Sequence, residues 1–308
     1  MKESYSRYVN EAKGQFENLL DFYRLAEPPF SISPDPRFLY HTSGHLRAFS
    51  KTRSNIVQRQ GLTVICGDVG TGKSTVGRRI ELEFGSDEQA DSYATRLVKN
   101  AATWTTSSKM IRALSSEFGC DMRRSEDAQW LEFEKMAIRR SLEERVSLVL
   151  IIDEAQGIPS KVLIRLREIL NFEADTGKFV QILLLGTLEL WQTLSTPAFR
   201  SLKSRVAGGV SFLTPLDSSE LRKAIQFRLA VTGRDEPLFE DSCYDVIYEA
   251  SSGVLRTAVD ICRTALNLSF QAQERVISQL TVLEAADEVI NAMGFQFGET
   301  EGADAGAV

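Results

Sequence analysis

The chain has 308 residues, of which 43% are hydrophobic and 25% are charged, and its formal net charge is −6 at pH 7. This length and composition are typical of a globular protein with one large or two modest domains, and they exclude a collagen-like or wholly disordered chain. The negative charge argues against binding of nucleic acid by bulk attraction, so DNA binding would need a local basic patch.

Sorting signals and cysteine chemistry add little to this picture. The sequence has no apolar run of the roughly 18 residues that a membrane span needs, and its start, MKESYSRYVNEAKGQ, lacks the apolar core of a signal peptide. We therefore expect a cytoplasmic protein without a membrane partner.

The four cysteines have no CxxC spacing, and Cys66 and Cys262 lie in apolar segments that favour reduced, buried thiols. We predict neither a disulfide nor a metal site from Cys66, Cys120, Cys243 and Cys262.

Residues 1–27 are predicted to form a helical extension. Apolar side chains recur there at helical spacing, and the Pro28-Pro29 pair is expected to end the helix. The apolar residues are Phe16, Leu19, Leu20, Phe22 and Tyr23. Such a helix could dock on the body of the protein or on a neighbouring subunit.

Residues 28–215 alternate short apolar runs with amphipathic segments. The runs are LTVIC at 62–66, YATRLV at 93–98, SLVLII at 147–152 and FVQILLL at 179–185. This alternation predicts a parallel sheet with helices on both faces. We expect Gly119 to end the helix SSKMIRALSSEF and Pro159 to lie near the start of a helix KVLIRLREIL.

The pattern becomes purely helical after about residue 215. Asp217 and Glu220 have the spacing of an N-terminal capping box ahead of LRKAIQFRLAV, and Gly233 is expected to end that helix. Further helical segments lie at 240–251, 255–270 and 280–292. We therefore predict a separate all-helical lid domain over residues 216–295, followed by a disordered tail at 296–308 that is rich in small and acidic residues.

The segment GDVGTGKS at 67–74 matches the phosphate-binding P-loop in full, between the strand LTVIC and the helical STVGRRIELEF. A glycine-rich turn that contains a lysine by chance is the alternative, which the strand before it and the helix after it disfavour. The loop glycines let backbone N–H groups approach phosphate oxygens, Lys73 would reach the β and γ phosphates of ATP, and the Ser74 hydroxyl would bind Mg²⁺. The predicted nucleotide contacts are Gly67, Asp68, Val69, Gly70, Thr71, Gly72, Lys73, Ser74 and Thr75.

An acidic pair, Asp153 and Glu154, directly follows the apolar strand at 147–152. Phosphoryl transfer needs one carboxylate in the Mg²⁺ shell, here Asp153, and one on the attacking water, here Glu154. An acidic pair at a strand end could also be purely structural. Together with the P-loop, the pair predicts an enzyme that hydrolyses ATP.

Four more basic or polar residues are candidates, each with an alternative. Thr187 could orient the attacking water or sense the γ phosphate, or it could cap the helix LELWQTL. Arg205, and after it Arg200, could be an arginine finger that reaches the ATP of a neighbouring subunit, or part of a solvated basic surface. Arg256 could reach the γ phosphate from the lid and couple lid angle to nucleotide state, or it could lie on a helix surface.

The two histidines, His41 and His45, have no acidic or cysteine partners at ligand spacing. A metal site is therefore disfavoured, and we expect these side chains to line the adenine side of the nucleotide site or to lie on the surface.

Several segments together resemble the ExeA-like AAA+ ATPases over roughly residues 20 to 290. They are FYRLAEPPFSISPDPRFLYHTSGHLRAF at 22–49, GDVGTGKST, VLIIDEAQ at 149–156, LLLGTLEL and SSGVLRTAVDICRTAL. The resemblance implies an α/β AAA+ P-loop NTPase, in which a parallel sheet flanked by helices precedes a small C-terminal all-helical lid. It also implies that the PDPRFLY segment packs near the adenine. The nucleotide roles that it implies fall on Lys73, Ser74, Asp153, Glu154, Thr187, Arg205 and Arg256.

The same resemblance implies what the ATPase acts on. ExeA proteins of secretion-machine assembly carry a membrane segment and a peptidoglycan-binding region, which this sequence lacks. It looks more like the stand-alone TnsC-type transposition regulators, which bind duplex DNA as ATP-dependent homo-oligomeric rings or filaments and recruit a transposase. We therefore expect DNA, a transposase and a targeting protein as partners. The expected DNA contacts are Lys99, Lys109, Arg123 and Arg124.

Two other functions stay open at this point. One is an assembly ATPase that acts on a protein partner in secretion. The other is a nucleotide-gated scaffold or defence switch that uses ATP as a structural ligand. The intact Asp153-Glu154 pair weighs against the second of these, because a scaffold does not need a residue that orients the attacking water.

Overall fold

The computed structural model describes residues 19–31, 35–38, 40–175 and 177–298. The chain divides into two compact units. The α/β unit is His41–Thr214, and the helical unit combines Met1–Tyr40 with Pro215–Val308. Within the described residues, no helix combines the length and the apolar character needed to span a membrane.

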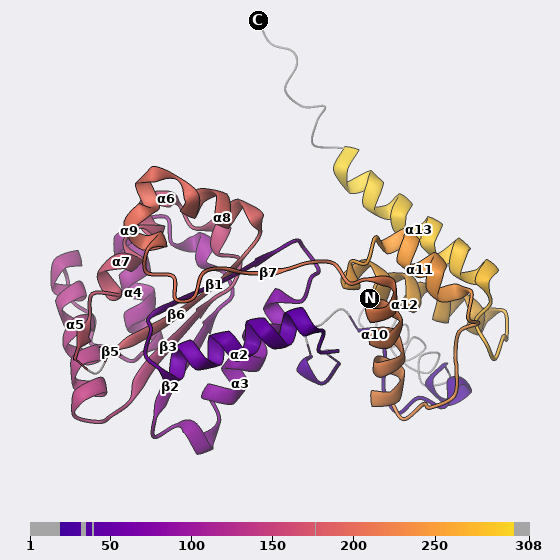
Figure 1. The fold of residues 1–308 in the computed structure, drawn as a ribbon, viewed down its shortest axis with the longest axis horizontal. Helices are drawn as coiled ribbons and strands as arrows, with labels where there is room; N and C mark the ends of the chain where they lie inside the picture. The colour runs from indigo at the N-terminus through magenta and orange to yellow at the C-terminus, as the bar shows by residue number, and fades with distance from the viewer. Residues whose placement is uncertain (1–18, 32–34, 39, 176, 299–308) are drawn as a thin grey trace, which may run out of the picture. The chain divides into compact units, whose positions relative to one another are not determined.

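The α/β unit is built on a five-stranded parallel sheet with the order β2-β3-β6-β1-β7 (Figure 1). The strands β1, β3 and β6 are buried along their whole length, which explains their continuous apolar runs. All four predicted strands are confirmed, whereas β7 has three residues and was too short to predict. The strands are β1 Leu62–Gly67, β2 Tyr93–Val98, β3 Ser147–Ile152, β6 Val180–Gly186 and β7 Ser211–Leu213, with a small hairpin of β4 Glu173–Ala174 and β5 Gly177–Lys178.

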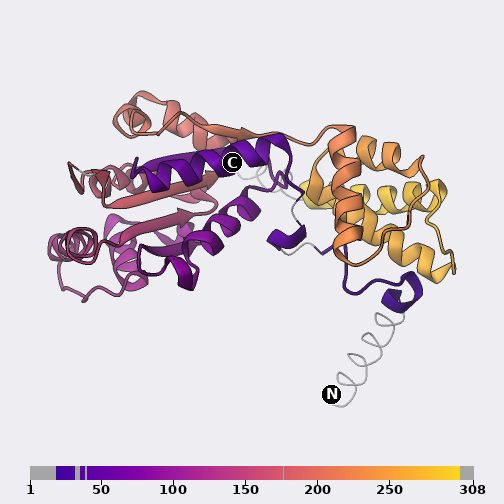
Figure 2. The ribbon, with the colours of Figure 1, turned by 60° about the horizontal axis from the view of Figure 1, so that its bottom comes forward.

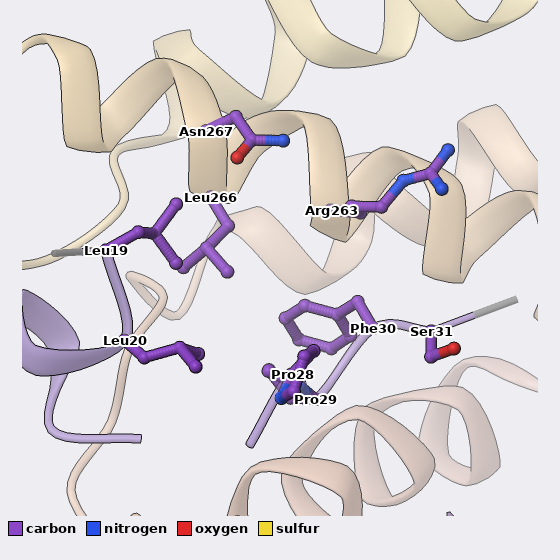
Figure 3. Close-up of a pocket in the computed structure, with 9 residues that line it drawn as sticks. All are labelled: Leu19, Leu20, Pro28, Pro29, Phe30, Ser31, Arg263, Leu266 and Asn267. Carbon is purple, nitrogen blue, oxygen red and sulfur yellow. The ribbon is translucent and has the colours of Figure 1, made fainter. Parts of the chain in front are cut away.

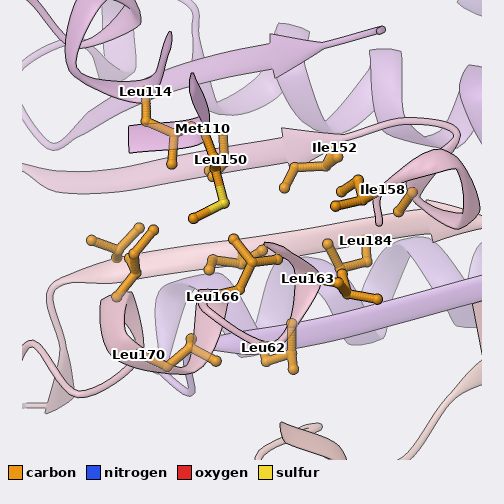
Figure 4. Packing of buried hydrophobic residues seen from close by; sticks show 14 of the residues in the cluster. Leu62, Met110, Leu114, Leu150, Ile152, Ile158, Leu163, Leu166, Leu170 and Leu184 are labelled. Carbon is orange, nitrogen blue, oxygen red and sulfur yellow. The ribbon is translucent and has the colours of Figure 1, made fainter. Parts of the chain in front are cut away.

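Helices cover both faces of this sheet, as predicted (Figure 2). On one face, the helices α2 Ser43–Val57 and α3 Lys73–Phe84 pack against the side chains that the central strands direct toward that face. The other face carries α4 Ser107–Glu117, α5 Glu126–Leu142, α6 Ser160–Leu163, α7 Leu166–Ile169, α8 Leu188–Ser195 and α9 Arg200–Lys203. Figure 4 shows this second core, where Leu150 and Leu184 of the strands face Met110 of α4 and Leu166 of α7.

The helix predicted as KVLIRLREIL is interrupted, and this prediction is wrong in its continuity. Pro159 does occupy the N-cap position of α6, but α6 and α7 are single turns separated by Ile164 and Arg165. The N–H groups of Arg165 and Arg167 bond to carbonyls three residues back instead of four. These tighter bonds are typical of a 3₁₀ segment, which periodicity in the sequence does not distinguish from a helix. In contrast, Gly119 follows α4 with a φ of 73°, as predicted.

The helical unit contains the four predicted helices of the C-terminal region. They are α10 Ser218–Val231, α11 Cys243–Ser251, α12 Leu255–Gln271 and α13 Gln279–Gly298. Asp217 accepts a hydrogen bond from the Glu220 N–H at 2.7 Å in the predicted capping box, and Gly233 follows α10 with a φ of 83°. The predicted tail was placed too early, because α13 continues to Gly298, and residues 299–308 lie outside the described residues.

The N-terminal segment belongs to the helical unit, which differs from the expected boundary at residue 28. Leu19, Tyr23 and Phe30 are buried in its core, and the Pro29 carbonyl accepts a hydrogen bond from Arg228 at 3.1 Å. The first described helical turn also ends at Tyr23 rather than at Pro28, because Arg24 has a φ of 55°. Residues 1–18, which include the predicted Phe16 contact, lie outside the described residues.

A cavity of about 330 Å³ lies between this N-terminal segment and α12 (Figure 3). Its walls are mainly apolar, with Arg263 and Asn267 of α12 as polar groups, and Arg263 forms an ion pair with Asp260 at 2.9 Å. Elsewhere in the chain, Cys66 and Cys262 are buried in apolar surroundings, as predicted. Burial raises the pKa of the Cys66 thiol to about 11, so this thiol is an inert core residue at neutral pH.

Candidate nucleotide-binding site

Three adjacent strands bring the predicted catalytic residues to one edge of the sheet. In the register of β1 and β6, Cys66 pairs with Gly186, and in that of β3 and β6, Ile152 pairs with Leu184. The P-loop after β1, Thr187 after β6 and Asp153 after β3 therefore follow strand ends that lie side by side. The carboxyl edge of a parallel sheet is where ligands bind in open α/β folds.

The P-loop turns back on itself before it enters α3. The Thr71 hydroxyl donates to the Asp68 carbonyl at 2.8 Å, and the Asp68 carboxylate accepts from the Val69 N–H at 2.9 Å. Gly72 forms the N-cap of α3 with a φ of 90°, so the helix begins at Lys73. Ser74 and Thr75 lie in the first turn of α3, where unpaired N–H groups and the helix dipole favour an anion.

His45 contacts the P-loop and holds it in place, a role that the sequence did not indicate. Its side chain is 2% exposed, and its Nε2 lies 2.8 Å from the Thr71 carbonyl while Nδ1 lies 2.7 Å from the Thr42 hydroxyl. Because a carbonyl only accepts, Nε2 carries the proton in this arrangement. A Cβ on residue 72 would lie 2.7 Å from Nε2, so only a glycine at this position leaves room for the His45 side chain. His41, the second histidine, contacts Arg79 instead.

Lys73 is buried at the centre of the loop, with 5% of its surface exposed. Its ammonium donates to the carbonyls of Gly67 at 3.0 Å and Asp68 at 2.7 Å. Burial lowers the pKa of Lys73, and the carboxylates of Glu154, Asp153 and Asp68 oppose this shift. Lys73 is thus a desolvated cation next to both acidic residues, a position in which additional negative charge would be stabilised strongly.

The two residues of the acidic pair differ in burial and in backbone conformation. Asp153 is 8% exposed and accepts a hydrogen bond from the Glu154 N–H at 3.0 Å. Glu154 has left-handed backbone angles, with φ 53° and ψ 41°, and its side chain is exposed. A non-glycine residue in this conformation costs of order 1 kcal/mol and is found preferentially at functional sites.

The predicted Mg²⁺ ligands, Ser74 and Asp153, offer the oxygen donors that this ion prefers. Among the described residues, no group of three or more His, Cys, Asp or Glu side chains is placed to hold a metal ion. This donor set fits Mg²⁺, which usually takes one or two protein oxygens and completes its shell with phosphates and water.

Thr187 is the N-cap residue of α8 by its backbone, but its side chain does not cap the helix. Its hydroxyl donates to the Glu189 carboxylate, and its N–H donates to the Gln156 Oε1 at 3.2 Å. Thr187 therefore occupies the N-cap position, as the capping alternative predicted, but its hydroxyl accepts no hydrogen bond from the N–H groups of the helix. Gln156 is a second residue that the motif analysis missed.

The candidate arginines occupy different surroundings. Arg205 is half-buried, and its Nη1 donates to the Leu170 carbonyl at 3.4 Å. Arg200 begins α9 and is exposed, and its guanidinium makes no hydrogen bond or ion pair with the described residues. Arg256 lies in the first turn of α12 in the helical unit and is exposed. The nucleotide roles of all three stay predictions.

The four predicted DNA contacts come from three segments of the α/β unit. Lys99 follows β2 and Lys109 lies in the first turn of α4, whereas Arg123 and Arg124 follow the other end of this helix. The chain returns along α4 after its end, because Arg112 in the middle of this helix donates to the carbonyls of Arg123 at 2.8 Å and Arg124 at 2.7 Å. Arg123 also forms ion pairs with Glu132 at 2.8 Å and Asp121 at 3.7 Å, which offset its charge.

Comparisons with known proteins agree with this geometry. Residues 55–194 match the family model described as an AAA domain. Cdc6p from Pyrobaculum aerophilum has a TM-score of 0.63 at 16% identity, over 88% of this chain and 71% of that one. The fold is that of an AAA+ P-loop NTPase. The fold class predicted from the sequence is therefore confirmed.

Two further structures share the fold at similar distance. The ORC1 protein of Aeropyrum pernix, solved in complex with DNA, has a TM-score of 0.57 at 18% identity, over 82% of this chain and 66% of that one. The RuvB Holliday junction branch migration motor of Thermotoga maritima has a TM-score of 0.52 at 17% identity, over 79% and 68%. At such identities the likeness establishes the AAA+ fold alone.

A curated protein is similar over most of this AAA+ chain. General secretion pathway protein A of Aeromonas hydrophila is 29% identical over 269 residues, which are 87% of this chain and 48% of that protein. The chain thus spans about half the length of this relative. The similarity supports the ExeA-like part of the resemblance, in agreement with the match of residues 55–194 to an AAA domain.

Proposed function

We propose that the protein binds ATP with Mg²⁺ and hydrolyses it. The observation that carries the proposal is the shared sheet edge, where Lys73, Thr187 and the Asp153-Glu154 pair follow three neighbouring strands. Lys73 and the N–H groups of the P-loop bind the β and γ phosphates, and Ser74 and Asp153 hold the metal. Glu154 accepts a hydrogen bond from the attacking water and orients it toward the γ phosphate.

Mg²⁺, when bound, neutralises charge that develops on the phosphate oxygens. The chain's own residues make the remaining contributions to binding and hydrolysis. His45 and Gly72 fix the loop, so its N–H groups are oriented before the nucleotide arrives, which lowers the cost of ordering on binding. A direct test is phosphate release from ATP with Mg²⁺, measured with and without duplex DNA. Turnover that is absent under both conditions would remove the proposal.

We further propose that hydrolysis needs a neighbouring copy of the chain, which supplies an arginine finger. Arg205 is the proposed finger and Arg200 the second candidate, the latter supported by its exposed guanidinium without a partner among the described residues. An arginine placed against a neighbour's γ phosphate stabilises the charge of the transition state. Arg256 is proposed to contact the nucleotide from the lid of the same subunit.

Mixing experiments test the finger. Arg205→Ala and Lys73→Ala chains are each expected to be inactive, but an equal mixture should recover about a quarter of the activity, since this share of interfaces joins an intact P-loop to an intact finger. The same mixture with Arg200→Ala identifies which arginine acts in trans. If neither mixture regains any activity, no finger is supplied by a neighbour at these positions.

We propose that the ATP-bound chains assemble into rings or filaments on duplex DNA. This assembly selects target sites and recruits a transposase with its targeting protein. The resemblance to TnsC-type regulators supports this role, and the exposed Lys99, Lys109 and Arg124 offer contacts to phosphates. Each subunit brings few such contacts, so a monomer binds weakly and an array binds well. The ion pairs of Arg123 make it the weakest of the four predicted contacts.

DNA binding is expected to fall about tenfold when Lys99, Lys109 and Arg124 are all replaced by alanine, equally on all sequences and with a smaller salt slope, because three phosphate contacts per subunit are lost. Electrophoretic shifts with ATP, ADP and no nucleotide measure this. Lys135→Ala, at an exposed lysine of α5, controls for charge. If the wild-type chain ignores DNA at low salt under all three conditions, the transposition role is wrong.

The second candidate function is an assembly ATPase with a protein partner. The similarity to general secretion pathway protein A specifically favours it. ATP turnover that is unaffected by DNA would fit this candidate better than the transposition role. A nucleotide-gated scaffold or defence switch would instead bind ATP with negligible turnover.

A further inference from the structure

Gln156 bridges two residues of the catalytic edge. It lies in the short 3₁₀ turn η4 (Ala155–Gly157), two residues after Glu154. Its Nε2 donates to the Glu154 carboxylate, and its Oε1 accepts from the Thr187 N–H at 3.2 Å. The amide thus links Glu154, which is proposed to orient the attacking water, to Thr187, which directly follows β6.

The orientation of this amide is determined by its partners. A backbone N–H can only donate, so the Gln156 oxygen must face Thr187, and the NH₂ group is left to face Glu154. An ionised carboxylate can only accept, which matches the NH₂ group. A hydrogen bond between a neutral donor and a charged acceptor is stronger than one between neutral groups.

The surrounding backbone holds Gln156 in this place. Ala155 is fully buried in the core under the turn, and Glu154 has its left-handed conformation just before it. The turn packs against β6 and α8. On β6, Gly186 leaves the room that Gln156 needs, because a Cβ there would lie 3.0 Å from Oε1 and 2.6 Å from Leu190.

We propose that Gln156 is a positioning residue for ATP hydrolysis, which fixes the Glu154 carboxylate relative to the end of β6. This inference rests on the proposed ATPase function and concerns how its water-orienting residue is held. The Glu154 side chain is long and exposed, and the bond to Gln156 restricts the rotamers that it can adopt. Because Gln156 acts through Glu154, its loss affects turnover and leaves nucleotide binding unchanged.

Two substitutions distinguish the effect of the amide donor from the effect of side-chain size. Gln156→Ala removes both hydrogen bonds and is expected to lower kcat about tenfold with KM within twofold. Gln156→Glu keeps the shape and the acceptor for Thr187 but replaces the donor by a second carboxylate. At pH 8.5 this variant is expected to lower kcat at least as much as alanine does, since it repels the charge of Glu154.

The split between kcat and KM gives a signature of positioning. Gln156 contacts the Glu154 side chain and the Thr187 N–H, and it is not one of the predicted nucleotide contacts. Both Gln156 variants are therefore expected to lower kcat while KM stays within twofold.

The experiment is steady-state phosphate release by the full chain at pH 8.5 over a range of ATP concentrations, with thermal unfolding of each variant. Gln192→Glu makes the same change at an exposed position of α8 and is expected to match wild type. Wild-type kcat in both Gln156 variants would overturn the positioning role while the ATPase proposal stands. A lower unfolding temperature together with a raised KM would assign Gln156 a structural role instead. A wild-type chain without turnover would remove both proposals.

Discussion

Lys73→Met is expected to lower the affinity for ATP about 100-fold, which corresponds to the loss of charge-assisted hydrogen bonds to the phosphates. The ammonium is the cation at the centre of the P-loop, and it lies in a desolvated position where its charge acts over a low dielectric. Methionine keeps the apolar stem of the side chain and removes the ammonium with its charge and donors. The N–H groups of the loop and of the first turn of α3 remain, so weak binding persists.

The measurement is a calorimetric or fluorescent-nucleotide titration, with thermal unfolding as a check on the fold. Burial lowers the pKa of Lys73, so loss of its charge removes a desolvation cost, while loss of its hydrogen bonds to the Gly67 and Asp68 carbonyls opposes this gain. Lys161→Met, at an exposed lysine of α6, is the matched control. Wild-type ATP affinity in Lys73→Met would mean that the P-loop is not the phosphate site.

Glu154→Gln is expected to lower kcat about 1,000-fold and to leave ATP affinity within twofold, because the carboxylate that orients the water is lost while the metal ligands stay. The substitution is conservative in its contacts. The carbonyl oxygen of the new amide can still accept from Gln156, and the N–H at position 154 can still donate to Asp153. Only the charge and the basicity are removed.

Single-turnover phosphate release and nucleotide titration test this split between turnover and binding. The variant should also hold any ATP-dependent assembly on DNA longer than wild type, because the ATP-bound form is the one proposed to assemble and hydrolysis would remove it. Asp127→Asn, an exposed position of α5, is the matched control for the change of charge. Turnover at the wild-type rate in Glu154→Gln would mean that another residue orients the water.

The sequence predicted the centre of the fold because its signals are local. The strands β1, β3 and β6 are buried on both faces, so they appear as continuous apolar runs. The P-loop and the acidic pair follow two of these runs directly. The capping box of α10 was equally readable, since Asp217 and Glu220 are three residues apart and satisfy each other.

The sequence could not predict contacts between residues far apart in the chain. His45 meets Thr71 across 26 positions, and Gln156 meets Thr187 across 31. Arg123 appeared to be a free cation, but the fold brings Glu132 of α5 to its guanidinium. These pairings follow from the tertiary fold and leave no periodicity that a motif search could detect.

The domain boundary was misplaced for a related reason. The proline pair after residue 27 marks a break in the backbone, but it does not say which core the next apolar residues enter. Phe30 is buried in the helical unit, where its ring lies 6.0 Å from that of Phe239. A contact across that many residues outweighs the local signal for a boundary.

Phosphate release from ATP by the wild-type chain, compared with Lys73→Met and Glu154→Gln at equal protein concentration, tests the central claim most directly. The account predicts Mg²⁺-dependent turnover by the wild type, with loss of binding in the first variant and loss of turnover with retained binding in the second. Turnover that is equal in all three proteins, or absent from the wild type with and without DNA, would contradict it.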